Sequence, residues 1–144
     1  MKTEHSAGGV IVSLIHNQWF VLILKDMNDT WTFPKGLIEK GERPVVSATR
    51  EIKEEVAITN LILLAPLPSI HYVYKRHGTI KKTVYYFIFQ STVRTRPKVQ
   101  KGEGIQEAQW VPIDKAIDMI GYRETNVPLL EETWKLLKRQ ISNG

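Results

Sequence analysis

One segment of the chain spaces its apolar residues in a way that constrains the fold more than any other feature. In residues 44–56 the apolar positions lie 3, 4 and 4 residues apart, at Val45, Ala48, Ile52 and Val56. This spacing places them along one side of an α-helix. Pro44 suits the first turn of that helix, because its missing N–H would have no intrahelical partner there. We therefore predict a helix over about 44–56 that packs one face against the rest of the fold.

Strand-like segments lie on both sides of this helix. Short runs rich in β-branched and aromatic residues, separated by turn residues, predict strands at 5–14, 19–24, 61–64, 71–74, 79–92 and 105–111. The first two are expected to pair as a hairpin around a turn at 16–18. Residues 31–33 are expected to be extended, and residues 34–36 to turn.

Two further helices are predicted near the end of the chain. The first lies near 114–120. The second is expected to start after Asn126, with Pro128 in its first turn and apolar positions at spacings of 4, 3 and 4 from Leu130 to Ile141. Strands with interspersed helices favour an α/β sandwich, in which one sheet is covered on both sides.

Composition excludes several classes of protein. The 144 residues suit one domain over 1–144, and 42% hydrophobic with 24% charged residues exclude a disordered or coiled-coil chain. There are no cysteines, which excludes disulfides, thiolate zinc sites and cysteine nucleophiles. We see no secretory signal, and the longest apolar runs, such as 61–67, are too short to span a bilayer. We expect a soluble, cytoplasmic protein that binds no membrane, with its oligomeric state open.

Charge is distributed unevenly along the chain. The segment 36–58 holds five glutamates, whereas no acidic residue occurs between Glu55 and Glu103, an interval with eight lysines and arginines. An acidic cluster next to a basic half could bind a metal ion and a polyanion side by side. The alternative is a solvated surface with uneven charge.

The predicted helix carries three carboxylates on its polar face. Glu51, Glu54 and Glu55 fall within an arc of about 100°. Like charges this close destabilise a helix slightly, so a hard cation such as Mg²⁺ would explain them, with one glutamate left to act as a general base. The alternative is a solvated acidic face whose charge is softened by Arg50 and Lys53.

The spacing around this helix matches a known pattern. From Gly36, five residues lead to Glu42 and seven more lead to the run Arg50-Glu51-Ile52-Lys53-Glu54-Glu55-Val56-Ala57-Ile58. This resembles the Nudix box, G-x5-E-x7-R-E-U-x-E-E-x-G-U with U aliphatic, at every fixed position but one. The match covers 23 residues, and segments 7–10, 31–36 and 107–111 extend the resemblance along the chain.

The resemblance implies a Nudix-type α/β/α sandwich with a mixed β-sheet and a Mg²⁺-dependent hydrolase, with Mn²⁺ as a possible substitute. The substrate implied is a nucleoside diphosphate linked to another group. By position, Glu51 and Glu55 resemble the main metal ligands, and Glu54 resembles a ligand that can also serve as the base. Gly36 lies where a backbone carbonyl often reaches the metal.

Other residues acquire supporting roles from the same resemblance. Arg50 resembles the arginine that orients the glutamates of the box, and Glu42 resembles one that steadies its loop. Many members add a carboxylate from a distal loop, for which Glu103 and Glu107 are candidates. Glu103 lies between two glycines, in a setting suited to swinging over a substrate. The alternative for both is a plain surface glutamate.

One position departs from the family pattern. Ala57 stands where the family has glycine. Just past the end of a helix, that glycine adopts a left-handed backbone, which costs an alanine about 1 kcal/mol. This leaves the exact end of the helix open. Because the substitution removes no ligand, we expect the chemistry to survive it.

Substrate choice must come from outside the box. Tyr74, 16 residues beyond Ile58, resembles a tyrosine that contacts the nucleotide base in the diadenosine polyphosphate (Ap4A) hydrolase branch, and segments 31–36 and 81–87 also resemble that branch. An aromatic face can stack on adenine, and four nearby cations can neutralise a polyphosphate: Lys75, Arg76, Lys81 and Lys82. The alternative is that Tyr72 and Tyr74 merely alternate on a strand, one inward and one outward.

Three functions follow as hypotheses. The first is a diadenosine polyphosphate hydrolase that cleaves Ap4A to ATP and AMP by attack of water on a phosphate. The second is another Nudix activity, on RNA 5′ ends, inositol pyrophosphates or a damaged nucleotide, with RNA as a partner through the basic half. The third is a catalytically silent domain that only binds nucleotide or RNA, which the three intact carboxylates disfavour.

Overall fold

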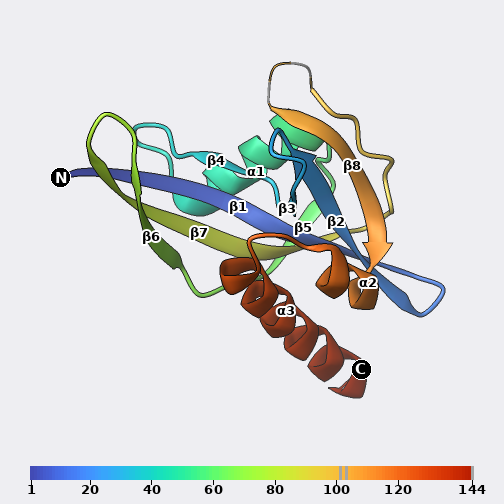
Figure 1. Cartoon of the computed structure of the whole chain (residues 1–144). Helices are drawn as coiled ribbons and strands as arrows, with labels where there is room; N and C mark the ends of the chain where they lie inside the picture. The colour runs from blue at the N-terminus through green and yellow to red at the C-terminus, as the bar shows by residue number, and fades with distance from the viewer. Residues whose placement is uncertain (101, 103, 144) are drawn as a thin grey trace.

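One mixed β-sheet with helices on both faces forms the body of the protein (Figure 1). The computed structural model describes residues 1–100, 102 and 104–143. The elements in chain order are β1 (Lys2–Ile15), β2 (Gln18–Asp26), β3 (Trp31–Thr32), β4 (Lys35–Leu37), α1 (Pro44–Val56), β5 (Leu61–Pro66), β6 (Ile70–Lys75), β7 (Thr79–Ser91), β8 (Ile105–Pro112), α2 (Ile113–Met119) and α3 (Arg123–Asn143).

The sheet is mixed because its two longest strands run parallel. Among the described residues its central order is β3-β2-β1-β7-β5, while β4 pairs with β1, β6 with β7 and β8 with β2. Strands β1 and β7 are parallel over Lys2–Val12 and Ile80–Gln90, and the other pairs are antiparallel. A parallel pair needs a crossover connection, and α1 lies in it.

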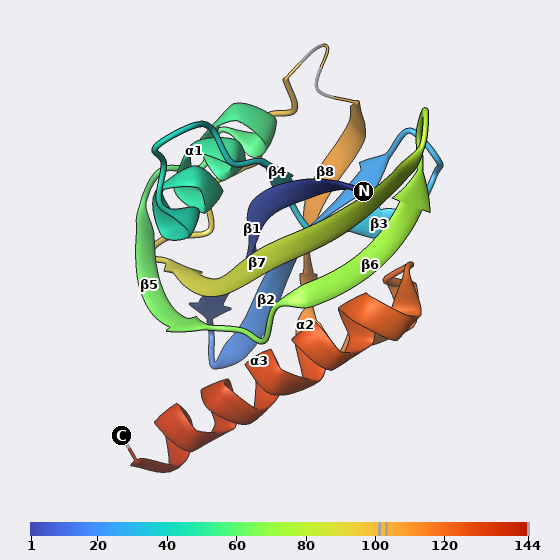
Figure 2. The same ribbon diagram turned by 90° about the vertical axis from the view of Figure 1, so that its left-hand side faces the viewer.

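Alternation along the strands divides the buried residues between two faces. Ile11 and Leu22 face α1 and pack with Ala48, Ile52 and Val56 of that helix. The neighbours of these residues along β1 and β2 are Val10, Val12, Val21 and Ile23. They belong to a second cluster, which also includes residues of α2 and α3. Figure 2 shows α1 on one side of the sheet and α3 on the other. The predicted α/β sandwich is confirmed.

The segment predicted to turn at 34–36 is instead a strand. Lys35–Leu37 forms β4 and pairs with β1, with Gly8 opposite Lys35. A side chain at Gly8 would overlap the Pro34 carbonyl and the Lys35 side chain, so the two strands approach closely because Gly8 has none. The turn prediction was wrong because Pro-Lys-Gly is typical of turns, and this pairing depends on a residue far back in the chain.

The start of the last helix was also predicted wrongly. Helix α3 begins at Arg123, and Pro128 lies inside it rather than in its first turn. The carbonyl of Tyr122 accepts hydrogen bonds from the N–H groups of Thr125 (3.1 Å) and Asn126 (2.9 Å), which starts the helix one turn earlier. A proline this near the start removes one intrahelical hydrogen bond, which the packing of α3 outweighs. None of the described helices has the length and apolar character needed to cross a membrane.

Candidate functional site

The guanidinium of Arg50 organises the polar face of α1. It donates to Glu42 from Nε (2.7 Å) and Nη2 (2.9 Å), to Glu51 from Nη1 (2.9 Å) and to Glu54 from Nη1 (3.1 Å). Nη2 also donates to the carbonyl of Leu37 at 3.0 Å. One cation therefore holds three carboxylates and the end of β4 in a single cluster, called the Arg50 cluster below.

Hydrogen bonding in this cluster changes the acidity of its members. The Arg50 guanidinium, followed by the backbone N–H of Glu39, lowers the pKa of Glu42 to about 2. The pKa of Arg50 is raised, first by its hydrogen bond to Glu42. Because Glu42 precedes α1 and is held by a helix residue, the loop between β4 and α1 is fixed to the helix.

Two carboxylates of α1 are buried one helical turn apart. Glu51 is 8% exposed and Glu55 is 6% exposed. A side chain at Gly36 would overlap the Glu51 carboxylate, so the missing Cβ lets that carboxylate lie directly against the backbone of β4. The structure thus brings together Gly36, Glu51 and Glu55, three of the residues predicted to hold a metal ion.

The donor chemistry of this place fits Mg²⁺. No cluster of three or more candidate metal-binding side chains is found among the described residues. Mg²⁺ does not require one, because proteins usually bind it through one or two carboxylates, with water and substrate phosphates completing the shell. Glu51 and Glu55, with the backbone of Gly36 beside them, supply a donor set of that kind.

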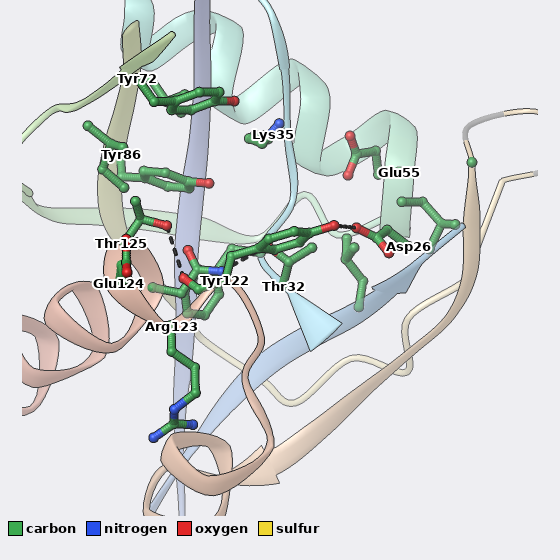
Figure 3. Close-up of a pocket in the computed structure, with 17 residues that line it drawn as sticks. Asp26, Thr32, Lys35, Glu55, Tyr72, Tyr86, Tyr122, Arg123, Glu124 and Thr125 are labelled. Atoms are coloured by element: carbon green, nitrogen blue, oxygen red, sulfur yellow. Dashed lines mark hydrogen bonds between the residues drawn. The ribbon is translucent and has the colours of Figure 1, made fainter. Parts of the chain in front are cut away.

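A cavity of about 730 Å³ opens beside Glu55 (Figure 3). Its apolar part includes Phe33, Val84 and the ring of Tyr86, which packs edge-on against Phe33 at a centroid distance of 6.3 Å. Burial raises the pKa of the Tyr86 hydroxyl. Tyr72 of β6 also lines the cavity. Further polar lining residues come from five elements and the turn before α3: Asp26, Thr32, Lys35, Glu55, Tyr122, Arg123, Glu124, Thr125 and Asn126.

A hydrogen-bonded pair joins the two sides of this cavity. The hydroxyl of Tyr122 donates to Asp26 at 2.7 Å (Figure 3). The same hydroxyl accepts from the side chain of Asn28 at 3.3 Å. The side chain of Asn126 donates to Thr32 at 3.1 Å. These bonds tie the turn before α3 and the first turn of α3 to the end of β2 and to β3, so the cavity is built by residues about 95 positions apart.

Three of the predicted substrate-binding residues gather around Glu4. Its carboxylate accepts from the hydroxyl of Tyr74 at 2.6 Å and from Lys82 at 2.9 Å, and Arg76 donates to the Tyr74 hydroxyl at 3.1 Å. The hydrogen bonds from Tyr74 and then Lys82 lower the pKa of Glu4 to about 2. The same bond to Glu4 raises the pKa of Tyr74. This Glu4 cluster ties β6 and β7 to β1.

The positions of the two tyrosines of β6 correct one expectation. Tyr72 and Tyr74 do not alternate between inward and outward, because their ring centroids lie 6.2 Å apart. Residues two apart on a strand share a face, so the alternation considered from the sequence was wrong. Tyr72 lines the cavity, whereas Tyr74 is not among its lining residues. Strand periodicity could have identified Tyr72 as a candidate together with Tyr74.

The remaining predicted residues lie elsewhere. Lys75 and Lys81 are exposed on β6 and β7 and do not line the cavity. Glu107 is exposed on β8, opposite Lys25 of β2. Glu103 lies outside the described residues, so its predicted role stays a prediction. Sequence reasoning missed the cavity residues Lys35, Tyr86 and Tyr122, because no local pattern marks side chains that only the fold brings together.

Comparisons with known proteins concern the family and the fold of the chain. Residues 4–133 match the family described as NUDIX domain. An RNA pyrophosphohydrolase from Nitratiruptor sp. is 37% identical over 51 residues, which are 35% of this chain and 33% of that protein. An 8-oxo-(d)GTP phosphatase from Mycolicibacterium smegmatis is 33% identical over 94 residues, 65% of this chain and 27% of that protein. The chain thus matches about a third or less of the length of these two curated relatives.

A solved structure resembles the fold over nearly its whole length. The binary complex of a C. elegans Ap4A hydrolase superposes with a TM-score of 0.78 and 26% sequence identity, covering 94% of this chain and 98% of that one. The arrangement of sheet and helices is therefore shared along both chains.

Proposed function

Because the chain belongs to the NUDIX domain family, we propose that it is a Mg²⁺-dependent hydrolase of phosphoanhydride bonds whose substrate is a diadenosine polyphosphate. On this proposal it cleaves Ap4A to ATP and AMP, with Mn²⁺ as a substitute cation. The observation that carries the proposal is the aromatic cavity beside Glu55, since it brings space for a nucleoside next to carboxylates suited to a divalent cation.

Glu51, Glu55 and the carbonyl of Gly36 would hold the cation. When bound, Mg²⁺ supplies charge neutralisation for the phosphate chain and makes a water molecule more acidic. Arg50 keeps Glu51 and Glu54 in fixed orientations through its hydrogen bonds. Glu54, whose side chain is 44% exposed, is the candidate base that takes the proton from the attacking water.

Tyr72 is the residue we propose for stacking on the nucleotide base. Tyr72 lines the cavity, and the residue is 39% exposed, so part of it is accessible to a ligand. Tyr74, the tyrosine indicated by the sequence, has its hydroxyl bonded to Glu4 and lies against Arg76. Tyr74 would therefore act on substrate binding indirectly, by packing near the ring of Tyr72; the two ring centroids are 6.2 Å apart.

Similarity to the C. elegans Ap4A hydrolase supports this substrate class. The relative named RNA pyrophosphohydrolase favours a second candidate, removal of pyrophosphate from triphosphorylated RNA 5′ ends. The exposed lysines of β6 and β7 support that candidate too, because neutralising phosphates does not depend on base sequence.

The test is product analysis by anion-exchange chromatography after incubation with Ap4A and Mg²⁺. We expect ATP and AMP in equal amounts from the wild type, no products in excess chelator, and a kcat at least about 100-fold lower in Glu55→Gln. Cleavage of triphosphorylated RNA without cleavage of Ap4A would select the second candidate. Undiminished hydrolysis in Glu55→Gln or in excess chelator would refute the metal site.

A further inference from the structure

An uncharged stretch of the chain coincides with one edge of the sheet. Residues 56–74 contain no aspartate, glutamate, lysine or arginine, although these residues make up 24% of the chain. The stretch holds all of β5 and all of β6 except Lys75. Both strands pair with β7 and, among the described residues, with no other strand, so they follow each other along one side of β7 (Figure 2). This edge therefore presents backbone donors and acceptors without a strand partner and with almost no charge.

Apolar side chains are uncovered on both faces of β5. Ile62 is 50% exposed and Leu63 is 47% exposed. Because successive residues of a strand point to opposite faces, one of these side chains lies on each face. Leu61 packs against the buried cluster that includes residues of α1, and Leu64 packs against the cluster that includes residues of α2 and α3. Both parts of the core thus extend to β5 and end there with apolar surface still exposed.

The opposite edge of the sheet has a different composition. There β8 pairs with β2 alone among the described strands, and its exposed residues are Gln106, Glu107 and Gln109. Proteins commonly place charges or prolines on a free edge, which prevents it from pairing with another chain. In β5 the only such residue is Pro66, at the last position of the strand. Pairing with another chain is therefore disfavoured at β8 and not at β5.

Charge determines which partner suits this edge. A polyanion such as a nucleic acid would meet no cation along β5. The chain as a whole carries a formal charge of +5, so two copies repel each other in general. That repulsion is weakest along β5, because the strand itself has no charge. A second copy also offers an edge with the same free donors and acceptors, and two identical strands can pair antiparallel about a two-fold axis.

We propose that β5 is a homodimerisation strand, which pairs antiparallel with β5 of a second copy about a two-fold axis near Ile62 and Leu63. The pairing joins the two sheets into one and brings the exposed apolar side chains of the two copies together on each face. Because β5 has six residues, the interface is small, and we expect a weak dimer with a Kd of about 10 μM. No residue of β5 lines the cavity, so the inference does not depend on the proposed reaction.

Sedimentation velocity over about 1–200 μM protein measures the association, and the wild type should shift from monomer to dimer in this range. Ile62→Lys and Leu63→Lys bring like charges of the two copies together, so each should raise the Kd at least about tenfold. Met27→Lys is the matched control, because Met27 is 68% exposed in the turn between β2 and β3, outside the edge. It should leave the Kd unchanged. Circular dichroism and thermal melting check that each variant is folded.

Cross-linking tests the geometry without adding charge. The chain has no cysteine, so Ile62→Cys and Leu63→Cys each introduce a single thiol. A residue on the two-fold axis lies opposite its own copy, so at least one of these variants should form a disulfide-linked dimer under mild oxidation, and Met27→Cys should not. Equal cross-linking of all three variants, or a Kd unchanged in both lysine variants of β5, overturns the inference. A wild type that stays monomeric also overturns it and would make a strand of a different protein the occupant to test.

Discussion

The Arg50 cluster and the Glu4 cluster are built from the same kinds of side chain but with opposite charge balance. In the first, one guanidinium bonds three carboxylates of Glu42, Glu51 and Glu54. In the second, one carboxylate is surrounded by Lys82, Arg76 and the hydroxyl of Tyr74. The first retains excess negative charge, as a cation site requires, whereas the second neutralises part of the basic half of the chain.

This difference shows why total charge is a poor guide to where a polyanion binds. Four cations between residues 75 and 82 suggest a polyphosphate site from the sequence. In the fold, Arg76 and Lys82 are engaged around Glu4, and Lys75 and Lys81 are exposed outside the cavity lining.

Removing the guanidinium of the Arg50 cluster should have the largest effect on kcat and on the free energy of unfolding. In Arg50→Met, the carboxylates of Glu51 and Glu54 lose the cation that orients them and repel each other. We expect kcat for Ap4A to fall at least about 100-fold and the free energy of unfolding to fall by about 2 kcal/mol. Steady-state kinetics and urea unfolding measure the two effects.

Lys53→Met is the matched control for this change. Lys53 is exposed on the same helix and lies between Glu51 and Glu54 in sequence, outside the hydrogen bonds of the cluster. It should change kcat less than about threefold. A kcat in Arg50→Met above half the wild-type value would mean that the cluster serves α1 stability and not the reaction.

Variants of the two tyrosines of β6 distinguish the contribution of the cavity to substrate binding from that of the Glu4 cluster. Tyr72→Ala should raise KM for Ap4A about tenfold with a smaller change in kcat, because base stacking contributes to ground-state and transition-state binding alike. Tyr74→Phe removes the hydroxyl that reaches Glu4 but keeps the ring, and it should raise KM less than about threefold. An unchanged KM in Tyr72→Ala would exclude Tyr72 as the base contact, and an equally raised KM in Tyr74→Phe would assign the binding effect to the Glu4 cluster.

The pH dependence of the free energy of unfolding tests the Glu4 cluster independently of the enzymatic activity. The pKa of Glu4 is about 2, below the 4.5 of an unperturbed glutamate, so its stabilising effect is complete above pH 4.5 and is lost as the pH falls toward 2. Glu4→Gln should lower the free energy of unfolding at pH 7 by about 1 kcal/mol, because solvent screens the pair. The difference from wild type should shrink toward zero near pH 2, and a constant difference would exclude ionisation of Glu4 as its cause.

The sequence predicted the parts of the molecule that are local in the chain. Helix α1 has the predicted bounds, and the residues of the Arg50 cluster lie within one short segment, so their spacing alone brought them together. The hairpin of β1 and β2 was confirmed for the same reason.

What the sequence could not predict depends on strand pairing between distant segments. The Glu4 cluster exists because β1 and β7 are parallel in a register that puts Glu4 beside Lys82. The strand at Lys35–Leu37 exists because Gly8 admits its backbone. No local propensity encodes either register, and the cavity, which draws on α1, α3 and several strands, follows only once the registers are set.

The smallest expected change in the free energy of unfolding concerns the end of α1. Ala57 adopts the left-handed conformation predicted for this position, with φ 59° and ψ 38°, and α1 ends at Val56. Ala57→Gly removes the strained Cβ and should raise the free energy of unfolding by about 0.5–1 kcal/mol, with kcat unchanged. The same exchange in the middle of a helix, Ala116→Gly in α2, should lower it by about 1 kcal/mol. If Ala57→Gly raises the melting temperature and Ala116→Gly lowers it, with kcat unchanged, then the helix that carries Glu51 and Glu55 has a strained end that does not affect the chemistry. A lower melting temperature in both variants would refute strain at Ala57.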